Sequence, residues 1–247
     1  MSGRVGSITT DVITDGLILN MDAENLASFS QNNKIINTVD TSKSGSFEGA
    51  PTFNDTSLSF KYLNFDGVDD WIRIKDSDFP SHRTAFTIEL IYSIWANHSG
   101  WKNPGIKKWQ TGGGSYNEWS LGAQSISGPS AFGWTVYNPA ASNSNSVNSE
   151  GVLDYTAGNW YYQVGTFDGA KNGLQKMYVN GVLYASDESG FAACKTYTAQ
   201  DVSVSNFGSS YQYEAKQNVA RVAYYNRALS DNEVLHNYNA LKGRFGL

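Results

Sequence analysis

The chain has 247 residues but only one cysteine, so an internal disulfide cannot form. We interpret that residue, Cys194, as a small buried apolar side chain. Charge is also scarce, because Asp, Glu, Lys and Arg make up 17% of the chain against about 25% in typical soluble proteins. Ser, Thr, Asn and Gly supply the polarity instead, and this mixture favours strands, turns and exposed loops over long helices.

The sequence lacks a basic cluster and a long apolar run. Lys107 and Lys108 form the only adjacent basic pair and the formal net charge is −5, so nucleic acid is not expected as a partner. No segment approaches the roughly 18 apolar residues of a membrane span, so no membrane insertion is expected. The first residues carry no apolar stretch of the signal-peptide kind, which predicts synthesis in a cytoplasm without export by the general secretory route.

Catalytic patterns are missing as well. Retaining glycosidases of sandwich folds place two carboxylates on one face of a strand, whereas Glu89 stands alone on its predicted strand. The chain has no Gly-x-Ser-x-Gly elbow, and its three histidines are scattered. The glycines at 112–114 are not followed by Lys-Ser/Thr, so they do not form a phosphate loop. The sequence therefore predicts a protein that is not an enzyme.

Apolar residues with a period of two run through most of the chain. In one segment Phe86, Ile88, Leu90, Tyr92 and Ile94 alternate with Thr87, Glu89, Ile91 and Ser93, which predicts a half-buried antiparallel strand. Asn180-Gly181 lies between two β-rich runs and predicts a type I′ hairpin, because that turn requires positive φ at both central residues. Strands separated by frequent turn signals are typical of a sandwich or barrel.

One helix is predicted near the end of the chain, over about 230–242. Ser230 and Glu233 have the spacing of a capping box. An apolar stripe follows, and Gly243 is the expected stop. Residues 1–15 are polar and are interpreted as an N-terminal arm, either frayed or tethering a partner chain, ahead of one domain over 16–247.

The order of six segments resembles concanavalin A-like, laminin G-type domains. These segments are Asp15–Ala23, Leu63–Ile72, Phe86–Glu89, Asn159–Gly169, Tyr178–Gly181 and Ala223–Ser230. The resemblance implies an all-β fold: a concanavalin A-like jelly-roll sandwich of two antiparallel sheets with one short C-terminal helix. It is far less specific for function, since this sandwich hosts many roles.

The closing segment, Asn237–Leu247, resembles the ending of virion structural proteins in large tailed phages. This resemblance implies a non-enzymatic virion component, such as a capsid decoration protein, a fibre or a tail adhesin, located in the particle. Its implied partners are other virion proteins, further copies of itself in a homo-oligomer, and surface glycans. The alternatives are a free microbial carbohydrate-binding lectin and, behind it, a glycan-cleaving enzyme.

Aromatic residues in a glycine-rich segment form the first candidate site. Trp101, Trp109 and Tyr116 lie near Asn117, and sugars are commonly held by exposed aromatic rings flanked by amides. We predict glycan contact through these four residues. The alternative is that the rings fill the core or a subunit interface.

Three acidic residues in one short turn form the second candidate. Asp66, Asp69 and Asp70 offer the oxygen ligands that calcium prefers, and calcium-binding relatives of the resembled family use such loop carboxylates. No cofactor is required by any motif, so calcium is an optional ligand here. The alternative is that Asp66 and Asp69 cap the turn by accepting from backbone amides.

Overall fold

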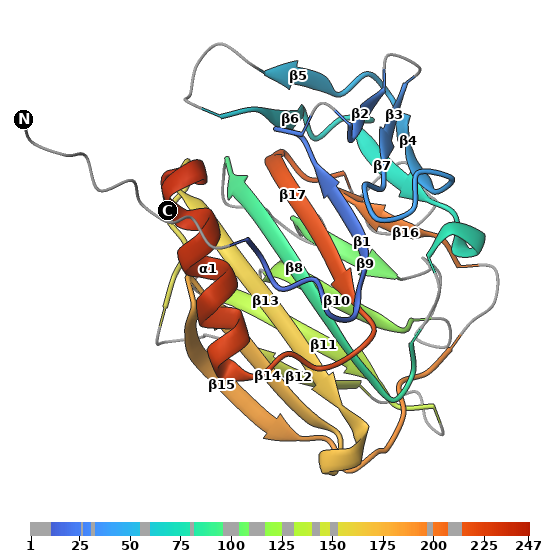
Figure 1. The fold of residues 1–247 in the computed structure, drawn as a ribbon, viewed down its shortest axis with the longest axis vertical. Helices are drawn as coiled ribbons and strands as arrows, with labels where there is room; N and C mark the ends of the chain where they lie inside the picture. Colours follow the sequence, from blue (N-terminus) through green and yellow to red (C-terminus); the bar gives the residue numbers. More distant parts are fainter. Residues whose placement is uncertain are drawn as a thin grey trace, which may run out of the picture.

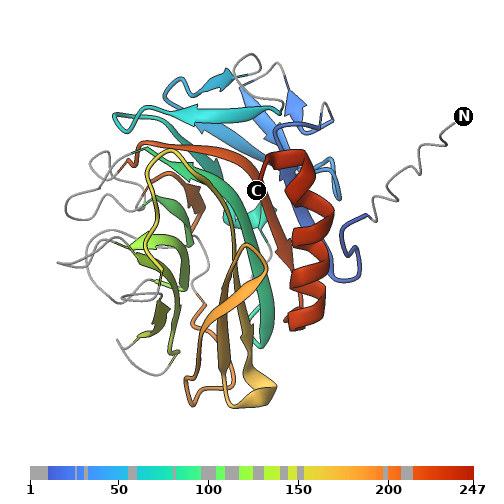
Figure 2. The same ribbon diagram turned by 90° about the vertical axis from the view of Figure 1, so that its left-hand side faces the viewer.

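The protein is a sandwich of two antiparallel sheets with one long helix on the outside (Figures 1 and 2). The computed structural model describes residues 11–25, 27–30, 33–54, 60–79, 82–95, 104–108, 117–124, 131–139, 144–148, 153–196, 200–206 and 214–247. The predicted fold class is confirmed. Within the described residues, no helix is both long and apolar enough to cross a bilayer.

The first sheet has the strand order β15-β14-β13-β8-β17-β6-β5, and β1 also pairs with β17. Its strands are β15 (Val182–Glu188), β14 (Leu174–Val179), β13 (Trp160–Asp168), β8 (Ala85–Ile94), β17 (Gln217–Tyr225), β6 (Tyr62–Phe65), β5 (Thr52–Asn54) and β1 (Leu17–Asp22).

The second sheet has the order β12-β11-β10-β9-β16-β7-β4-β3-β2. Its strands are β12 (Ser144–Asn148), β11 (Ala131–Tyr137), β10 (Trp119–Gln124), β9 (Gly105–Lys108), β16 (Val202–Val204), β7 (Trp71–Ile74), β4 (Ser44–Glu48), β3 (Lys34–Ile36) and β2 (Phe29–Ser30). Among the described residues, two 3-10 turns, η1 (Asp76–Asp78) and η2 (Gly169–Lys171), lie in the connections.

The main core fills the space between the sheets. Alternate residues of facing strands point into it, and Leu90, Trp134 and Phe167 are completely buried there. Cys194 also lies in this core at 2% exposure, as predicted. The Asn180-Gly181 hairpin is confirmed, because both residues have positive φ (50° and 78°), as a type I′ turn requires.

A second apolar layer lies between the first sheet and helix α1 (Asp231–Phe245), which crosses the outer face of that sheet (Figure 2). Ile91 and Tyr162 from the sheet pack against Val234 and Leu241 from the helix. The prediction that β8 is half-buried is therefore wrong: the helix covers the second face, and every residue from Phe86 to Ile94 is buried.

The helix begins as predicted and ends later than predicted. Ser230 accepts from the Glu233 amide, while the Glu233 carboxylate accepts from the Ser230 amide, so the capping box is confirmed. Gly243 does not stop the helix, which continues to Phe245 because Phe245 is buried and packs edge-on against Phe60. The stop is Gly246, whose φ of 65° is the left-handed conformation that glycine favours.

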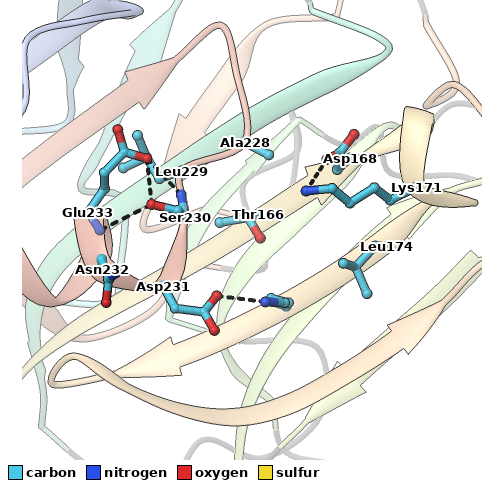
Figure 3. Close-up of a pocket in the computed structure, with 11 residues that line it drawn as sticks. Thr166, Asp168, Lys171, Leu174, Ala228, Leu229, Ser230, Asp231, Asn232 and Glu233 are labelled. Carbon is cyan, nitrogen blue, oxygen red and sulfur yellow. Dashed lines mark hydrogen bonds and ion pairs between the residues drawn. The ribbon is translucent and has the colours of Figure 1, made fainter.

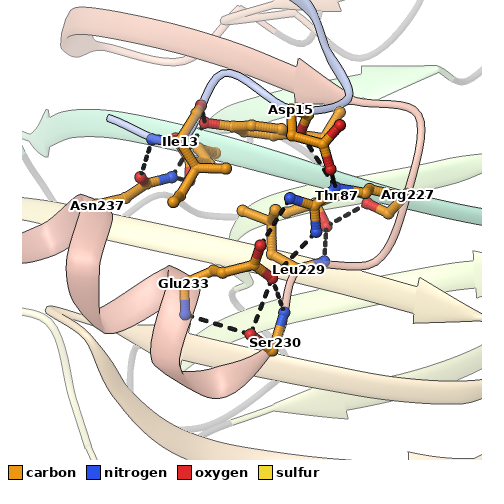
Figure 4. A network of polar contacts seen from close by, with 10 residues as sticks. Ile13, Asp15, Thr87, Arg227, Leu229, Ser230, Glu233 and Asn237 are labelled. Atoms are coloured by element: carbon orange, nitrogen blue, oxygen red, sulfur yellow. Dashed lines mark hydrogen bonds and ion pairs between the residues drawn. The ribbon is translucent and has the colours of Figure 1, made fainter. Parts of the chain in front are cut away.

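Residues 11–15 of the predicted arm lie along helix α1 (Figure 4). The Ile13 amide donates to Asn237 Oδ1 at 2.8 Å, and the hydroxyl of Tyr225 donates to the Ile13 carbonyl at 3.0 Å. Arg227 Nε lies 2.9 Å from a carboxylate oxygen of Asp15. These contacts fasten residues 11–15 to the helix and to the turn before it.

A buried polar network fixes the helix to the sheet. The Glu89 carboxylate, with no solvent exposure, accepts hydrogen bonds from the Tyr162 hydroxyl at 2.6 Å, from Arg221 Nη1 at 2.7 Å and from Asn237 Nδ2 at 2.7 Å. Burial works to lower the pKa of Arg221, but Glu89, Tyr225 and Asp22 together outweigh it, and the net direction is upward. Since Asn237 belongs to α1, Glu89 couples the first sheet to the helix.

Candidate ligand-binding site

An exposed tryptophan follows β8 directly. The side chain of Trp95 is 47% exposed, whereas the other described tryptophans are buried or partly buried. Ile94, the last residue of the strand, is buried in the core. Trp95 is the next residue, so its indole lies just beyond the end of the strand. An indole in this position offers a flat apolar surface with a hydrogen-bond donor at one edge.

Lys216 links this indole to the turn between β6 and β7. Its ammonium nitrogen lies 5.3 Å from the centre of the Trp95 ring system, within cation–π range. Its backbone lies against Gly67, where an added Cβ would be 2.9 Å from the Lys216 nitrogen. Gly67 also has a φ of 80°, so both space and conformation require glycine at this turn.

The turn itself carries Asp66, Asp69 and Asp70, and one oxygen of each carboxylate lies within 4.8 Å of the others. Asp70 accepts from the Ala50 amide at 2.8 Å and from the Asp66 amide at 3.1 Å, while Asp66 accepts from the Val68 amide at 2.7 Å. Burial raises the pKa of Asp70 against the lowering effect of these amides.

These bonds decide what the acidic turn does locally. The sequence offered Asp66 and Asp69 as the alternative turn caps; the amide bonds are made by Asp66 and Asp70 instead. Asp66 and Asp69 are exposed and Asp70 is buried. Asp66 and Asp70 brace the turn by accepting from backbone amides, and the three carboxylates offer the kind of oxygen ligands that calcium prefers.

The predicted aromatic cluster falls largely outside the described residues, where Trp101, Trp109 and Tyr116 lie. Asn117 is described and is 2% exposed, two residues before β10. Glycan contact through these residues stays a prediction. The structure thus brings the three predicted acidic residues together and leaves the aromatic cluster untested.

Sequence reasoning missed Trp95. The signal available was its position, since the alternation of β8 ends at Ile94 and polar, loop-forming residues follow from Asn97 onward. Periodicity alone could not reveal that Lys216, from a distant part of the chain, would lie over the ring.

Comparisons with known proteins agree with this architecture. The family model described as the concanavalin A-like lectin/glucanases superfamily matches residues 66–235. The chain belongs to this superfamily. No curated protein sequence matches the chain.

Among solved structures, domain 4 of AbnA, an extracellular arabinanase from Geobacillus stearothermophilus, is similar at 14% identity with a TM-score of 0.61. The match covers 90% of this chain and 98% of that one. The structure of that domain is in complex with arabinotriose. The binding domain of Paraclostridial Mosquitocidal Protein 1 is similar at 12% identity with a TM-score of 0.67, over 91% of this chain and 52% of that one. The binding domain of botulinum neurotoxin DC, in complex with SialylT, is similar at 16% identity with a TM-score of 0.60, over 92% and 52%. The chain thus spans about half the length of these two toxin domains, and at these identities the likeness shows the fold alone.

Proposed function

We propose that this protein is a carbohydrate-binding module without catalytic activity. The observation that carries the proposal is the end-to-end correspondence with an arabinanase domain that was solved in complex with arabinotriose. Both chains are covered almost completely, so the similarity concerns a whole module of the same size.

The end of the sandwich at Trp95 supplies suitable chemistry. Sugars present apolar C–H faces to aromatic rings and hydroxyl groups to acceptors and donors around them. Trp95 offers the ring, Lys216 a donor, and the exposed carboxylates of Asp66 and Asp69 offer acceptors. Trp101 and Trp109 come soon after Trp95 in the sequence, and their predicted contacts with the glycan remain part of this proposal.

The absence of catalysis is part of the proposal, supported by the position of Glu89. A glycosidase requires a carboxylate that reaches the sugar, usually as one of a pair. Glu89 lies under helix α1, and its two oxygens accept hydrogen bonds from Tyr162, Arg221 and Asn237. The Glu89 carboxylate therefore binds helix α1 to the first sheet and does not face a sugar.

A glycan array tests the proposal. Intact chain should bind a subset of printed oligosaccharides in a saturable manner and release no reducing ends from them. The variants Trp95→Ala, Trp101→Ala and Trp109→Ala should each weaken binding. Leu235→Ala is the matched control, because Leu235 is a large apolar residue at 44% exposure on α1. A chain that binds no printed glycan would refute the proposal.

The virion role is a second, finer proposal that rests on the resemblance of Asn237–Leu247. Much of this segment has a structural task, because Asn237, Leu241 and Phe245 are buried against the first sheet. The solved structures named above include no phage protein. Mass spectrometry of purified particles from a phage that encodes the chain tests this role, and absence of the chain from the particles would exclude it.

A further inference from the structure

A polar pocket lies at the end of the first sheet away from Trp95, between β13, β14 and the turn that starts helix α1 (Figure 3). Its volume is about 450 Å³, within the range of about 300–1,000 Å³ typical of small-ligand pockets. In the pairing of β13 with β8, Thr166 lies opposite Thr87, far from the end of β8 where Trp95 follows. At about 3.4 Å per residue, the two sites are roughly 25 Å apart.

The hydroxyl of Thr166 lies at the floor of the pocket. Thr166 is 3% exposed and lines the pocket, yet its hydroxyl makes no hydrogen bond with any described residue. Its neighbour Thr87 is different, because that hydroxyl donates to the Arg227 carbonyl and accepts from the Leu229 amide, both at 2.9 Å. Because Thr166 lines the pocket and no described side chain or backbone group uses its hydroxyl, a ligand in the pocket can form a hydrogen bond with it.

Two ion pairs form the walls. Lys176 Nζ lies 2.6 Å from Asp231 Oδ1, and Lys171 Nζ lies 3.1 Å from Asp168 Oδ2. Asp231 also accepts from the Tyr178 hydroxyl, and these bonds lower its pKa. Each ammonium therefore has a carboxylate beside it.

The lining favours a neutral ligand rather than an anion. Glu233 adds a further carboxylate, which is paired with Arg227, so each charged group of the lining has an opposite charge beside it. Ionised carboxylates can accept hydrogen bonds from adjacent hydroxyl groups, while the lysines can donate to ring or hydroxyl oxygens. Leu174 and Leu229 supply apolar surface beside these groups.

We propose that this pocket binds one neutral sugar unit, either a free monosaccharide or the terminal unit of a glycan. The hydroxyl of Thr166 would bond to it at the floor, the carboxylates of Asp168 and Asp231 would accept from its hydroxyls, and Leu174 would contact its C–H face. The ligand class rests on the proposed carbohydrate binding, but the site is separate from Trp95. The protein would then hold glycans at both ends of the first sheet, which increases avidity for clustered ligands.

The test is a titration of isotopically labelled intact chain followed by backbone amide chemical shifts. The probes are D-glucose, D-galactose, D-arabinose and N-acetyl-D-glucosamine, with sodium glucuronate as the anionic comparison. At least one neutral sugar should shift the amides of Thr166, Leu174 and Lys176 in a saturable manner, with a Kd of about millimolar, as expected for so small a ligand. Glucuronate should bind several-fold more weakly than the corresponding neutral sugar.

Two variants locate the site. Thr166→Val removes the hydroxyl at nearly constant shape and should weaken binding about tenfold, and Leu174→Trp should abolish it by filling the pocket. Thr156→Val is the matched control, because Thr156 is an exposed threonine in the turn before β13. Unchanged amide spectra away from the substituted residue show that each variant is folded.

The outcomes separate this pocket from the proposed site. Saturable shifts at Thr166 that Leu174→Trp removes would support the pocket, whatever happens at Trp95. Shifts confined to Trp95 and Lys216 would overturn the pocket and leave the proposed function standing. Tighter binding of glucuronate than of glucose at Thr166 would overturn the choice of a neutral ligand.

Discussion

The replacement of Glu89 by glutamine should cost a large part of the stability of the fold. The change keeps the shape of the side chain but removes the charge that faces Arg221, which is 2% exposed. Removing one member of a buried ion pair typically costs about 3–5 kcal/mol, because the other charge remains buried without compensation. Against a total of about 5–15 kcal/mol for a typical domain, this loss is readily measured.

Urea denaturation measures this loss, with the transition followed by tryptophan fluorescence and circular dichroism. Glu89→Gln should lower the midpoint at nearly constant m, and Glu188→Gln should change the free energy of unfolding by less than about 0.5 kcal/mol, because Glu188 is exposed on the edge strand β15. The double variant Glu89→Leu/Arg221→Met should be more stable than the sum of its single variants predicts, by about 2 kcal/mol or more. A Glu89→Gln variant that loses less than about 1 kcal/mol would refute the reasoning.

Three further predictions concern titration, reactivity and metal dependence. The hydrogen bonds from Arg227 lower the pKa of Glu233 from 4.5 to about 2. The stabilising contribution of Glu233 is therefore complete above pH 4.5 and is lost as the pH falls toward 2. Glu233→Gln should flatten the acid side of a plot of melting temperature against pH. Burial raises the pKa of the Cys194 thiol, so a thiol reagent at pH 8 should leave the native protein unmodified and modify it in urea, and rapid native labelling would show that the core opens. Because Asp66 and Asp70 are held by backbone amides, EDTA should leave the melting temperature unchanged, and a clear drop would reveal a required calcium ion.

Features that depend on near neighbours in the sequence were predictable. The turn at Asn180-Gly181 and the capping box of Ser230 and Glu233 are each decided within a few residues, and both are confirmed. The two-sheet architecture follows from strand periodicity together with the order of the family-like segments. The end of the helix was not predictable in this way, because Phe245 extends the helix by packing against Phe60 from a distant part of the chain.

The candidate sites show the same division. The acidic residues of one turn come together because they are neighbours in sequence. Trp95 becomes a candidate binding residue only through its contact with Lys216, which is distant in sequence. The pocket at Thr166 exists only because the turn before α1 passes over β13 and β14. Burial of Glu89 also depends on a segment distant in sequence. The periodicity of β8 indicated one buried face, but helix α1 covers the other face as well.

Binding of an oligosaccharide through Trp95 is the central claim, and calorimetric titration of the intact chain with the glycan that binds most strongly on the array tests it most directly. The account predicts a Kd about tenfold or more weaker for Trp95→Ala than for the native chain, and a Kd within about twofold of the native value for Leu235→Ala. Equal affinities of the native chain and Trp95→Ala would contradict it.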